Sequence, residues 1–189
     1  TTASKIEKKL GYPCFVKPAN AGSSVGITKA HNKEELMEGL KVAAVHDSKI
    51  VVEEGIVGRE IECAVLGNRG HVEASCVGEI FSAGEFYDYD AKYNNAESKT
   101  VVPAEISPEK QDEIRKMAVK VFNAVDGSGL ARVDFFVENE TENVIFNELN
   151  TLPGFTPISM YSMLWAACGK STAELLDNLI ELALERFSL

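Results

Sequence analysis

Two strand-like segments joined by a short polar turn constrain this chain more than any other feature. Residues 130–138 and 144–150 are rich in Val, Ile and Phe, and the polar residues 139–143 separate them. Short runs of β-branched and aromatic residues bounded by turn residues are typical of β-strands, so the pair predicts a hairpin. The register of that hairpin decides which side chains share a face.

Alternation along the two strands separates a polar face from an apolar one. In a hairpin closed by this turn, facing residue numbers sum to about 282, which places Asp134 opposite Glu148 and Arg132 opposite Asn150. The turn also permits a register shifted by two residues. The other face is expected to point into the core and carries Val133, Phe135, Val137, Ile145 and Leu149.

An Asp directly opposite a Glu is unfavourable on a sheet, so this pair requires a cation or a shared proton. Oxygen ligands without Cys or His suit Mg²⁺ or Mn²⁺. The sequence therefore predicts a metal site at Asp134, Glu148 and Asn150. The alternative is a solvated strand face with both carboxylates splayed into water, and the strongly apolar flanks argue against it.

Magnesium held by few protein oxygens commonly completes its coordination shell with substrate phosphates, so a phosphate-binding segment is expected elsewhere. The loop 19–26 has the required composition: glycines that permit positive φ, two serine hydroxyls, and a lysine on the preceding strand. These residues are Lys17, Gly22, Ser23, Ser24 and Gly26. Segments of this composition are also common as simple turns. The prediction of a phosphate-binding loop therefore depends on the presence of the acidic pair elsewhere in the chain.

A third segment has features of an adenine site. Residues 51–56 leave a strand with backbone donors and acceptors beside apolar atoms, as recognition of an adenine edge requires. Glu60 follows closely and has the chemistry to accept hydrogen bonds from ribose hydroxyls. Taken by itself, this segment does not identify a nucleotide site.

The remaining pattern predicts an α+β protein with antiparallel or mixed sheets and flanking helices, in the simplest case one compact unit of two interlocked lobes. Residues 82–100 have no sustained periodicity, which is typical of a functional or disordered loop. Helices are expected over 3–10, 32–45, 107–125, 158–168 and 172–187. Further strands are expected over 14–18 and over 49–54, 59–67 and 71–79, the last three forming one antiparallel sheet.

Composition narrows the range of partners. The chain has 19 Lys and Arg against 29 Asp and Glu, a formal net charge of −10, so neither nucleic acid nor a membrane surface is expected as a partner. No apolar run is long enough to span a bilayer and no leader is recognisable, so a soluble, unexported protein is expected. The chain starts at Thr1 without a Met, which favours a piece of a longer protein.

The four cysteines are scattered along the chain. They form no Cys-x-x-Cys pair, and no His stands at ligand spacing from any of them. Free thiols are therefore expected rather than a zinc site or a disulfide. The cysteines are Cys14, Cys63, Cys76 and Cys168.

Taken in order, these segments resemble the ATP-grasp portion of the D-alanine:D-alanine ligase family. The resemblance covers nearly the whole chain, and the combination of motifs is far more specific than any one of them. The motifs are FVKP (15–18), GSSVG (22–26), VEEGI (52–56) with Glu60, FYDYDAKY (86–93), ARVD (131–134) and NELNTLPG (147–154).

For the nucleotide, the resemblance implies contacts with each part of ATP. Lys17 would contact the α and β phosphates and Lys92 the γ-phosphate, while Ser23 would donate to or accept from Tyr93. The residues implied to bind adenine and ribose are Glu53, Glu54, Ile56 and Glu60. The loop implied to cover the phosphates consists of Gly22, Ser23, Ser24, Val25 and Gly26.

For metal and catalysis, the resemblance implies a second group of residues. Asp134, Glu148 and Asn150 would bind two Mg²⁺ ions, with Mn²⁺ as a substitute. Segment 82–100 would close as a lid that excludes water. The residues implied to stabilise the oxyanion are Arg132 and Gly154, and those implied to hold the second amino acid are Ser159 and Met160.

The activity implied is ATP-dependent ligation of two D-alanines to D-alanyl-D-alanine through an acyl phosphate, for peptidoglycan synthesis in a bacterial cytoplasm. Residues 1–58 would belong to the central lobe and 59–189 to the carboxy-terminal lobe. The resemblance implies that the family's amino-terminal domain is not part of this chain, so the chain alone is expected to bind ATP without forming dipeptide. Full-length relatives are expected to be homodimers.

Two alternatives stand beside this interpretation. One is a nucleotide-binding module without chemistry, which predicts loss of the metal or γ-phosphate ligands, and those residue types are all present. The other is a different ATP-grasp carboxylate–amine ligase, which would need another acceptor pocket. The acceptor itself, D-alanine, D-serine or D-lactate, is left open by the sequence.

Overall fold

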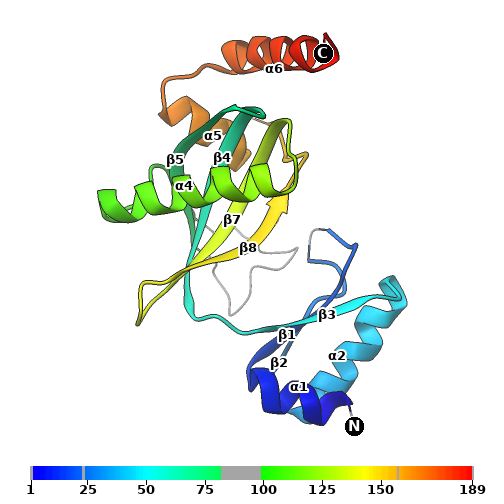
Figure 1. Ribbon diagram of the computed structural model, residues 1–189. Coiled ribbons are helices and arrows are strands. Elements are labelled where there is room, and N and C mark those ends of the chain that lie inside the picture. The colour runs from blue at the N-terminus through cyan, green and yellow to red at the C-terminus, as the bar shows by residue number, and fades with distance from the viewer. Residues whose placement is uncertain (1, 23, 82–98, 157, 189) are drawn as a thin grey trace. The chain divides into compact units, whose positions relative to one another are not determined.

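The computed structural model describes residues 2–22, 24–81, 99–156 and 158–188 (Figure 1). These residues form two compact units. Unit 1 contains the chain up to Ile56, and unit 2 contains Val57–Phe81 and the chain from Thr100 onward. Each unit combines a β-sheet with helices, so the expected α+β class is confirmed.

Unit 1 is a three-stranded sheet with two helices. The strand order is β2-β1-β3, and both pairings are antiparallel. Asn32 caps the second helix, since its side chain accepts a hydrogen bond from the backbone N–H of Glu35 at 2.9 Å. The elements are α1 (Thr2–Leu10), β1 (Cys14–Pro18), β2 (Thr28–Ala30), α2 (Lys33–His46) and β3 (Ile50–Glu54).

Unit 2 is built on a five-stranded sheet of order β6-β5-β4-β7-β8. The pairings of β4 with β5 and β7, and of β7 with β8, are antiparallel. Its strands are β4 (Gly58–Asn68), β5 (His71–Phe81), β6 (Lys99–Val101), β7 (Gly129–Glu138) and β8 (Val144–Asn150). Its helices are α4 (Pro108–Ala124), α5 (Met160–Ala167) and α6 (Thr172–Phe187).

One sequence expectation about the sheets is wrong. The strands expected over 49–54, 59–67 and 71–79 do not share a sheet, because β3 pairs with β1 whereas β4 lies in the second sheet. The backbone changes partners within three residues: Gly55 N donates to Pro13 O at 2.9 Å, and Val57 O accepts from Asn139 N at 3.2 Å. Strands β2 and β6 were not expected, since three residues are too few to show alternation.

The main core of unit 2 lies between one face of this sheet and α4, which crosses the strands in Figure 1. Helix α4 contributes Ile114, Ala118 and Phe122, all of them buried. Strands β4 and β7 contribute alternate residues from Ile61 to Val65 and from Ala131 to Val137. Alternation then leaves the intervening residues of both strands for the opposite face.

Helix α5 covers part of that opposite face. The Tyr161 hydroxyl donates to Val65 O at 3.1 Å. A Cβ on Gly78 would lie 2.8 Å from Met160 Sδ and 3.1 Å from Leu164 Cδ2, so glycine permits the close approach of helix and strand. Of the helices in the described ranges, none has the length and apolarity needed to cross a membrane.

The burial of Phe122 leads to a prediction about stability. Phe122→Ala removes a side chain that is 1% exposed, whereas Phe187→Ala makes the same change at a side chain that is 88% exposed. We expect Phe122→Ala to lower the free energy of unfolding by about 3–5 kcal/mol and Phe187→Ala to change it by less than about 0.5 kcal/mol. Urea denaturation followed by circular dichroism measures both. Equal losses would show that α4 does not anchor the core.

Candidate functional site

The hairpin of β7 and β8 has the expected register at its site end. Arg132 pairs with Asn150 and Asp134 with Glu148 in the antiparallel ladder. Side chains directly opposite each other in such a ladder have Cβ atoms about 4.5–5.5 Å apart. The predicted Asp–Glu pair is therefore brought together by the fold.

The register shifts immediately beyond this pair. Phe135 faces Phe146, so one extra residue, Asn147, is inserted into β8 between the two pairs. As a result Val144, and not Ile145, packs against the core of unit 2, which corrects the expected apolar face. The bulge keeps Glu148 and Asn150 on the polar face while the rest of the strand still contributes to the core.

Arg132 is held by carboxylates on two strands. Its Nε and Nη2 donate to Asp134 Oδ1 and Oδ2 at 2.8 and 2.7 Å, a two-pronged contact along β7. The same Nε lies 3.0 Å from Glu62 Oε2, on the neighbouring strand β4. Glu62 and Asp134 are only 6% and 8% exposed. We refer to Glu62, Arg132, Asp134, Glu148 and Asn150 as the charged face.

The amide of Asn150 connects the predicted carboxylate pair. Its Nδ2 donates to Asp134 Oδ2 at 3.0 Å and to Glu148 Oε1 at 3.3 Å. Asp134 is buried, whereas Glu148 is exposed. Arg132 and Asn150 therefore offset the repulsion between the acids. The charged face is buried at Asp134 and open to solvent at Glu148.

Opposing effects act on the pKa of Arg132. Burial lowers it, but the hydrogen bonds to Asp134 and the negative charges of Glu62, Asp134 and Glu148 raise it by more. The pKa therefore lies above its ordinary value, and the guanidinium stays cationic. A permanent cation amid carboxylates is a group that stabilises a developing negative charge.

Glu62 was not among the residues that sequence reasoning selected. It faces Asp134 across the β4–β7 ladder, and that pairing joins segments 72 residues apart in the sequence. A local signal exists, because Glu62 is the one charged residue in the segment IECAVLG (61–67), which is otherwise apolar. A buried acid in an apolar strand indicates a partner or a function.

The predicted metal ligands fit Mg²⁺ by their chemistry, since they are oxygen donors on one strand pair. In the structure Asp134 already accepts from Arg132 and Asn150, so binding a cation requires the Asn150 amide to turn its Oδ1 toward it. Across residues 2–22, 24–81, 99–156 and 158–188, no three or more His, Cys, Asp or Glu side chains are grouped to hold a metal. The candidate set is thus two carboxylates and one amide.

The predicted nucleotide residues are distributed between the units. In unit 1, Lys17 Nζ lies 2.7 Å from Glu53 Oε2, so two residues assigned to phosphate and adenine form an ion pair. Glu54 is exposed and Ile56 half-buried at the end of unit 1. Glu60 lies on β4 in unit 2, paired with Phe136 of β7.

The predicted phosphate loop contains two successive turns. Val25 N donates to Gly22 O at 3.2 Å and Ile27 N to Ser24 O at 3.4 Å. Positive φ occurs at Ser24 (59°) and Gly26 (75°) but not at Gly22, so only one of the two glycines uses its conformational freedom. At Gly26 a Cβ would also lie 2.5 Å from the His46 ring, so this position requires glycine.

The predicted acceptor residues lie where α5 begins. Ser159 precedes the helix, and its Oγ accepts from Thr156 N at 3.1 Å instead of capping α5. A Cβ on Gly154 would lie 2.8 Å from that Oγ, so Gly154 permits close packing of the loop. Met160 is buried against β5. Ser23, Lys92 and Tyr93, and the lid expected over 82–100 apart from its last two residues, lie outside the described residues.

Comparison with known proteins gives one family. The model of the D-ala D-ala ligase C-terminus matches residues 1–181. The D-alanine–D-alanine ligase of Acetivibrio thermocellus is 58% identical over 184 residues, which cover 97% of this chain and 49% of the relative. That of Clostridium novyi is 56% identical over 183 residues, covering 97% and 53%. The chain thus spans about half the length of the curated relatives it matches.

Solved structures agree with this result. The VanG D-Ala:D-Ser ligase from Enterococcus faecalis matches with a TM-score of 0.86 and 42% identity, over 95% of this chain and 52% of that one. The D-alanine-D-alanine ligase from Coxiella burnetii matches with a TM-score of 0.84 and 38% identity, over 98% and 48%. The chain therefore belongs to the D-alanine–D-alanine ligase family, within the carboxy-terminal region that the family model describes, and has the ATP-grasp fold.

Proposed function

We propose that this chain is the ATP- and metal-binding part of a ligase that joins two D-alanines into D-alanyl-D-alanine. The observation that carries the proposal is the charged face, in which a half-buried guanidinium and three acids gather on one side of the unit 2 sheet. Family membership supports the choice of reaction. A purely structural sheet face does not explain why acids are buried there.

The proposed reaction has two steps. The γ-phosphoryl group of ATP passes to the carboxylate of the first D-alanine, which gives an acyl phosphate and ADP. The amine of the second D-alanine then attacks the acyl carbon and loses a proton, and inorganic phosphate leaves from the tetrahedral intermediate. Both steps build negative charge on oxygens, so the protein must supply fixed positive charge and hydrogen-bond donors.

For the nucleotide, we propose a contact for each part of ATP. Lys17 and Lys92 bind phosphate oxygens as point charges, and Glu60 accepts from the ribose hydroxyls. Lys17 now pairs with Glu53, so ATP must compete with that carboxylate for the ammonium group. The loop proposed to cover the phosphates is Gly22, Ser23, Ser24, Val25 and Gly26, and the adenine contacts are Glu53, Glu54 and Ile56.

For the metal, we propose that Asp134, Glu148 and Asn150 hold two Mg²⁺ ions, with Mn²⁺ able to replace them. Bound there, the ions would neutralise charge on the transferring phosphoryl group and orient it. The register of β7 and β8 supports this assignment, since it brings the three donors to adjacent positions. The exposure of Glu148 leaves the open end of the charged face accessible to phosphates.

For the second step, we propose that Arg132 and the backbone of Gly154 stabilise the oxyanion, while Ser23 and Tyr93 position the reacting groups. Arg132 suits this role because two carboxylates fix its orientation before substrate arrives. Ser159 and Met160 are proposed to hold the carboxylate of the second amino acid. D-alanine is the proposed acceptor, although one solved relative is a D-Ala:D-Ser ligase.

The rest of the proposal concerns the whole enzyme. We assign the first D-alanine to the half of the relatives' length that this chain does not span. We further propose that the enzyme is a homodimer that works in the bacterial cytoplasm and supplies peptidoglycan synthesis. Residues 1–58 are assigned to its central lobe and 59–189 to its carboxy-terminal lobe.

The first test is calorimetric titration of this chain with ADP, with and without Mg²⁺. We expect Mg²⁺-dependent binding that Asp134→Asn weakens at least about tenfold, or about 1.4 kcal/mol, because a ligand carboxylate is lost. Asp177→Asn, the same change on the exposed surface of α6, is the matched control and should bind like the native chain. ADP binding that does not depend on Mg²⁺, or the absence of ADP binding by the native chain, would refute the proposed site.

The second test uses a full-length ligase that contains this chain. Asp134→Ala should abolish formation of D-alanyl-D-alanine, measured by chromatography of the products with ADP release followed in parallel. The isolated chain should form no dipeptide. Dipeptide formation by the Asp134→Ala enzyme would show that this carboxylate has no part in the reaction.

The third test concerns Arg132. Arg132→Met leaves Glu62 and Asp134 without the guanidinium, so we expect a loss of about 3–5 kcal/mol in the free energy of unfolding. Millimolar Mg²⁺ should restore part of it, because a divalent cation can replace the lost charge. Arg186→Met, on the exposed last turn of α6, is the control and should cost less than about 0.5 kcal/mol. A loss that Mg²⁺ does not reduce would argue against a cation site at these carboxylates.

A further inference from the structure

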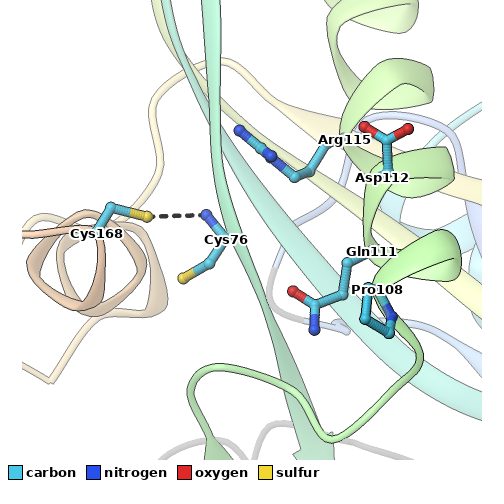
Figure 2. A pocket seen from close by; sticks show the side chains of 6 residues that line it. All are labelled: Cys76, Pro108, Gln111, Asp112, Arg115 and Cys168. Atoms are coloured by element: carbon cyan, nitrogen blue, oxygen red, sulfur yellow. Dashed lines mark hydrogen bonds between the residues drawn. The ribbon is translucent and has the colours of Figure 1, made fainter.

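Two of the four cysteines meet beside strand β5 of the unit 2 sheet. Cys76 lies on β5, and Cys168 directly follows α5. Figure 2 shows both beside a cavity of about 350 Å³, with the first turns of α4 on the other side. The cavity is lined by Cys76, Pro108, Gln111, Asp112, Arg115 and Cys168.

The contacts beside β5 bring the two residues together. The backbone N–H of Cys76 donates to Cys168 Sγ at 2.9 Å, which is the dashed line in Figure 2. The Cys76 thiol donates to Leu164 O, within α5, at 3.4 Å. On the α4 side, Arg115 Nη2 donates to Ala74 O at 3.0 Å. Side chains thus satisfy backbone groups of β5 here, and the sulfur of Cys168 is packed against Cys76.

The four thiols differ in access. Cys168 is exposed and Cys76 is partly exposed, whereas Cys14 and Cys63 are fully buried in the two cores. A reagent in solution can therefore reach the first pair without unfolding the chain. The open cavity beside Cys76 and Cys168 provides the path of approach.

We propose that Cys76 and Cys168 are an oxidisable pair that closes into a disulfide when a low-molecular-weight disulfide enters this cavity. The proposal rests on the position of the two residues and does not depend on the ligase activity. It makes the end of α5 a modification site. Closure would tie the end of α5 to strand β5 by a covalent bond.

The reaction consists of two thiol–disulfide exchanges. The Cys168 thiolate attacks the small disulfide, which forms a mixed disulfide at Cys168 and releases one small thiol. The Cys76 thiolate then attacks the Cys168 sulfur, which forms the Cys76–Cys168 bond and releases the second small thiol. The two protein thiols lose two electrons and two protons in total, and the small disulfide is reduced to two thiols.

The surroundings of Cys76 determine the rate of the second exchange. Burial, followed by the neighbouring Cys168 sulfur, raises the pKa of Cys76 to about 12. Because only the thiolate attacks, the rate of closure should increase about tenfold for each unit by which the pH is raised, as long as the pH stays below that value. The exposed Cys168 is the group that reacts first, and Cys76 completes the bond.

The test treats the reduced chain with excess oxidised glutathione at pH 9, followed by acid quench, alkylation and peptide mass mapping without reduction. We expect a peptide that links Cys76 to Cys168, loss of two of the four thiols, and unmodified Cys14 and Cys63. The thermal midpoint should rise on oxidation and fall back after treatment with dithiothreitol, since the bond restrains the unfolded chain.

Two controls make the outcome decisive. Cys168→Ser changes an exposed side chain, and circular dichroism verifies that it folds; it should give neither the cross-link nor the rise in thermal midpoint. Native chain oxidised in 8 M urea should give mixed pairings instead of one. Glutathione that stays on Cys168 without closure at pH 9, or pairing that involves Cys14 or Cys63, would overturn the proposal.

Discussion

The ion pairs of Arg132 hold the charged face together. One guanidinium binds Asp134 on its own strand and Glu62 on β4, so a single cation connects neighbouring strands. Both carboxylates are almost fully buried, and buried charges persist in a fold only when they are paired. Arg132 therefore allows acids to occupy the middle of a sheet whose other face is the core of unit 2. The contacts that fix the orientation of Arg132 for its proposed role in catalysis are thus the contacts that hold the strands together.

The same strands contribute to the core on one face and form the charged face on the other. Strand β7 contributes alternate residues to the core beneath α4, and the intervening residues form the charged face. The bulge at Asn147 lets β8 meet both demands, because it keeps Glu148 on the polar side while Val144 joins the core. On the same side of the sheet, Gly78 pairs with Glu62 in the β4–β5 ladder and allows α5 to approach the sheet. The helix thus covers the face directly beside the acids.

The local sequence pattern was sufficient to predict part of this structure and insufficient to predict the rest. The alternation of polar and apolar residues in the two strands predicted that Asp134 faces Glu148, and the structure contains this pair. The turn at 139–143 alone does not determine it, because the pairs next to the turn, such as Val137 with Val144, differ from it by one residue in register. Glu62 could not be placed, because its position depends on a pairing between strands far apart in the chain. The contact of Cys76 with Cys168 spans 92 residues and was missed for the same reason. The β8 bulge adds a single residue, and nothing in a periodic pattern marks where it falls.

The charges of the site connect metal binding to nucleotide binding. On the charged face, Glu62, Asp134 and Glu148 carry three negative charges and Arg132 one positive charge, which leaves two to be offset. One divalent cation is enough to neutralise them. A second ion would reverse the sign of the site unless a further anion arrived with it, and nucleotide phosphates supply that anion. Occupancy by two ions, as proposed for the ligase, therefore requires the nucleotide, so affinity for the second ion should depend on the nucleotide while affinity for the first does not.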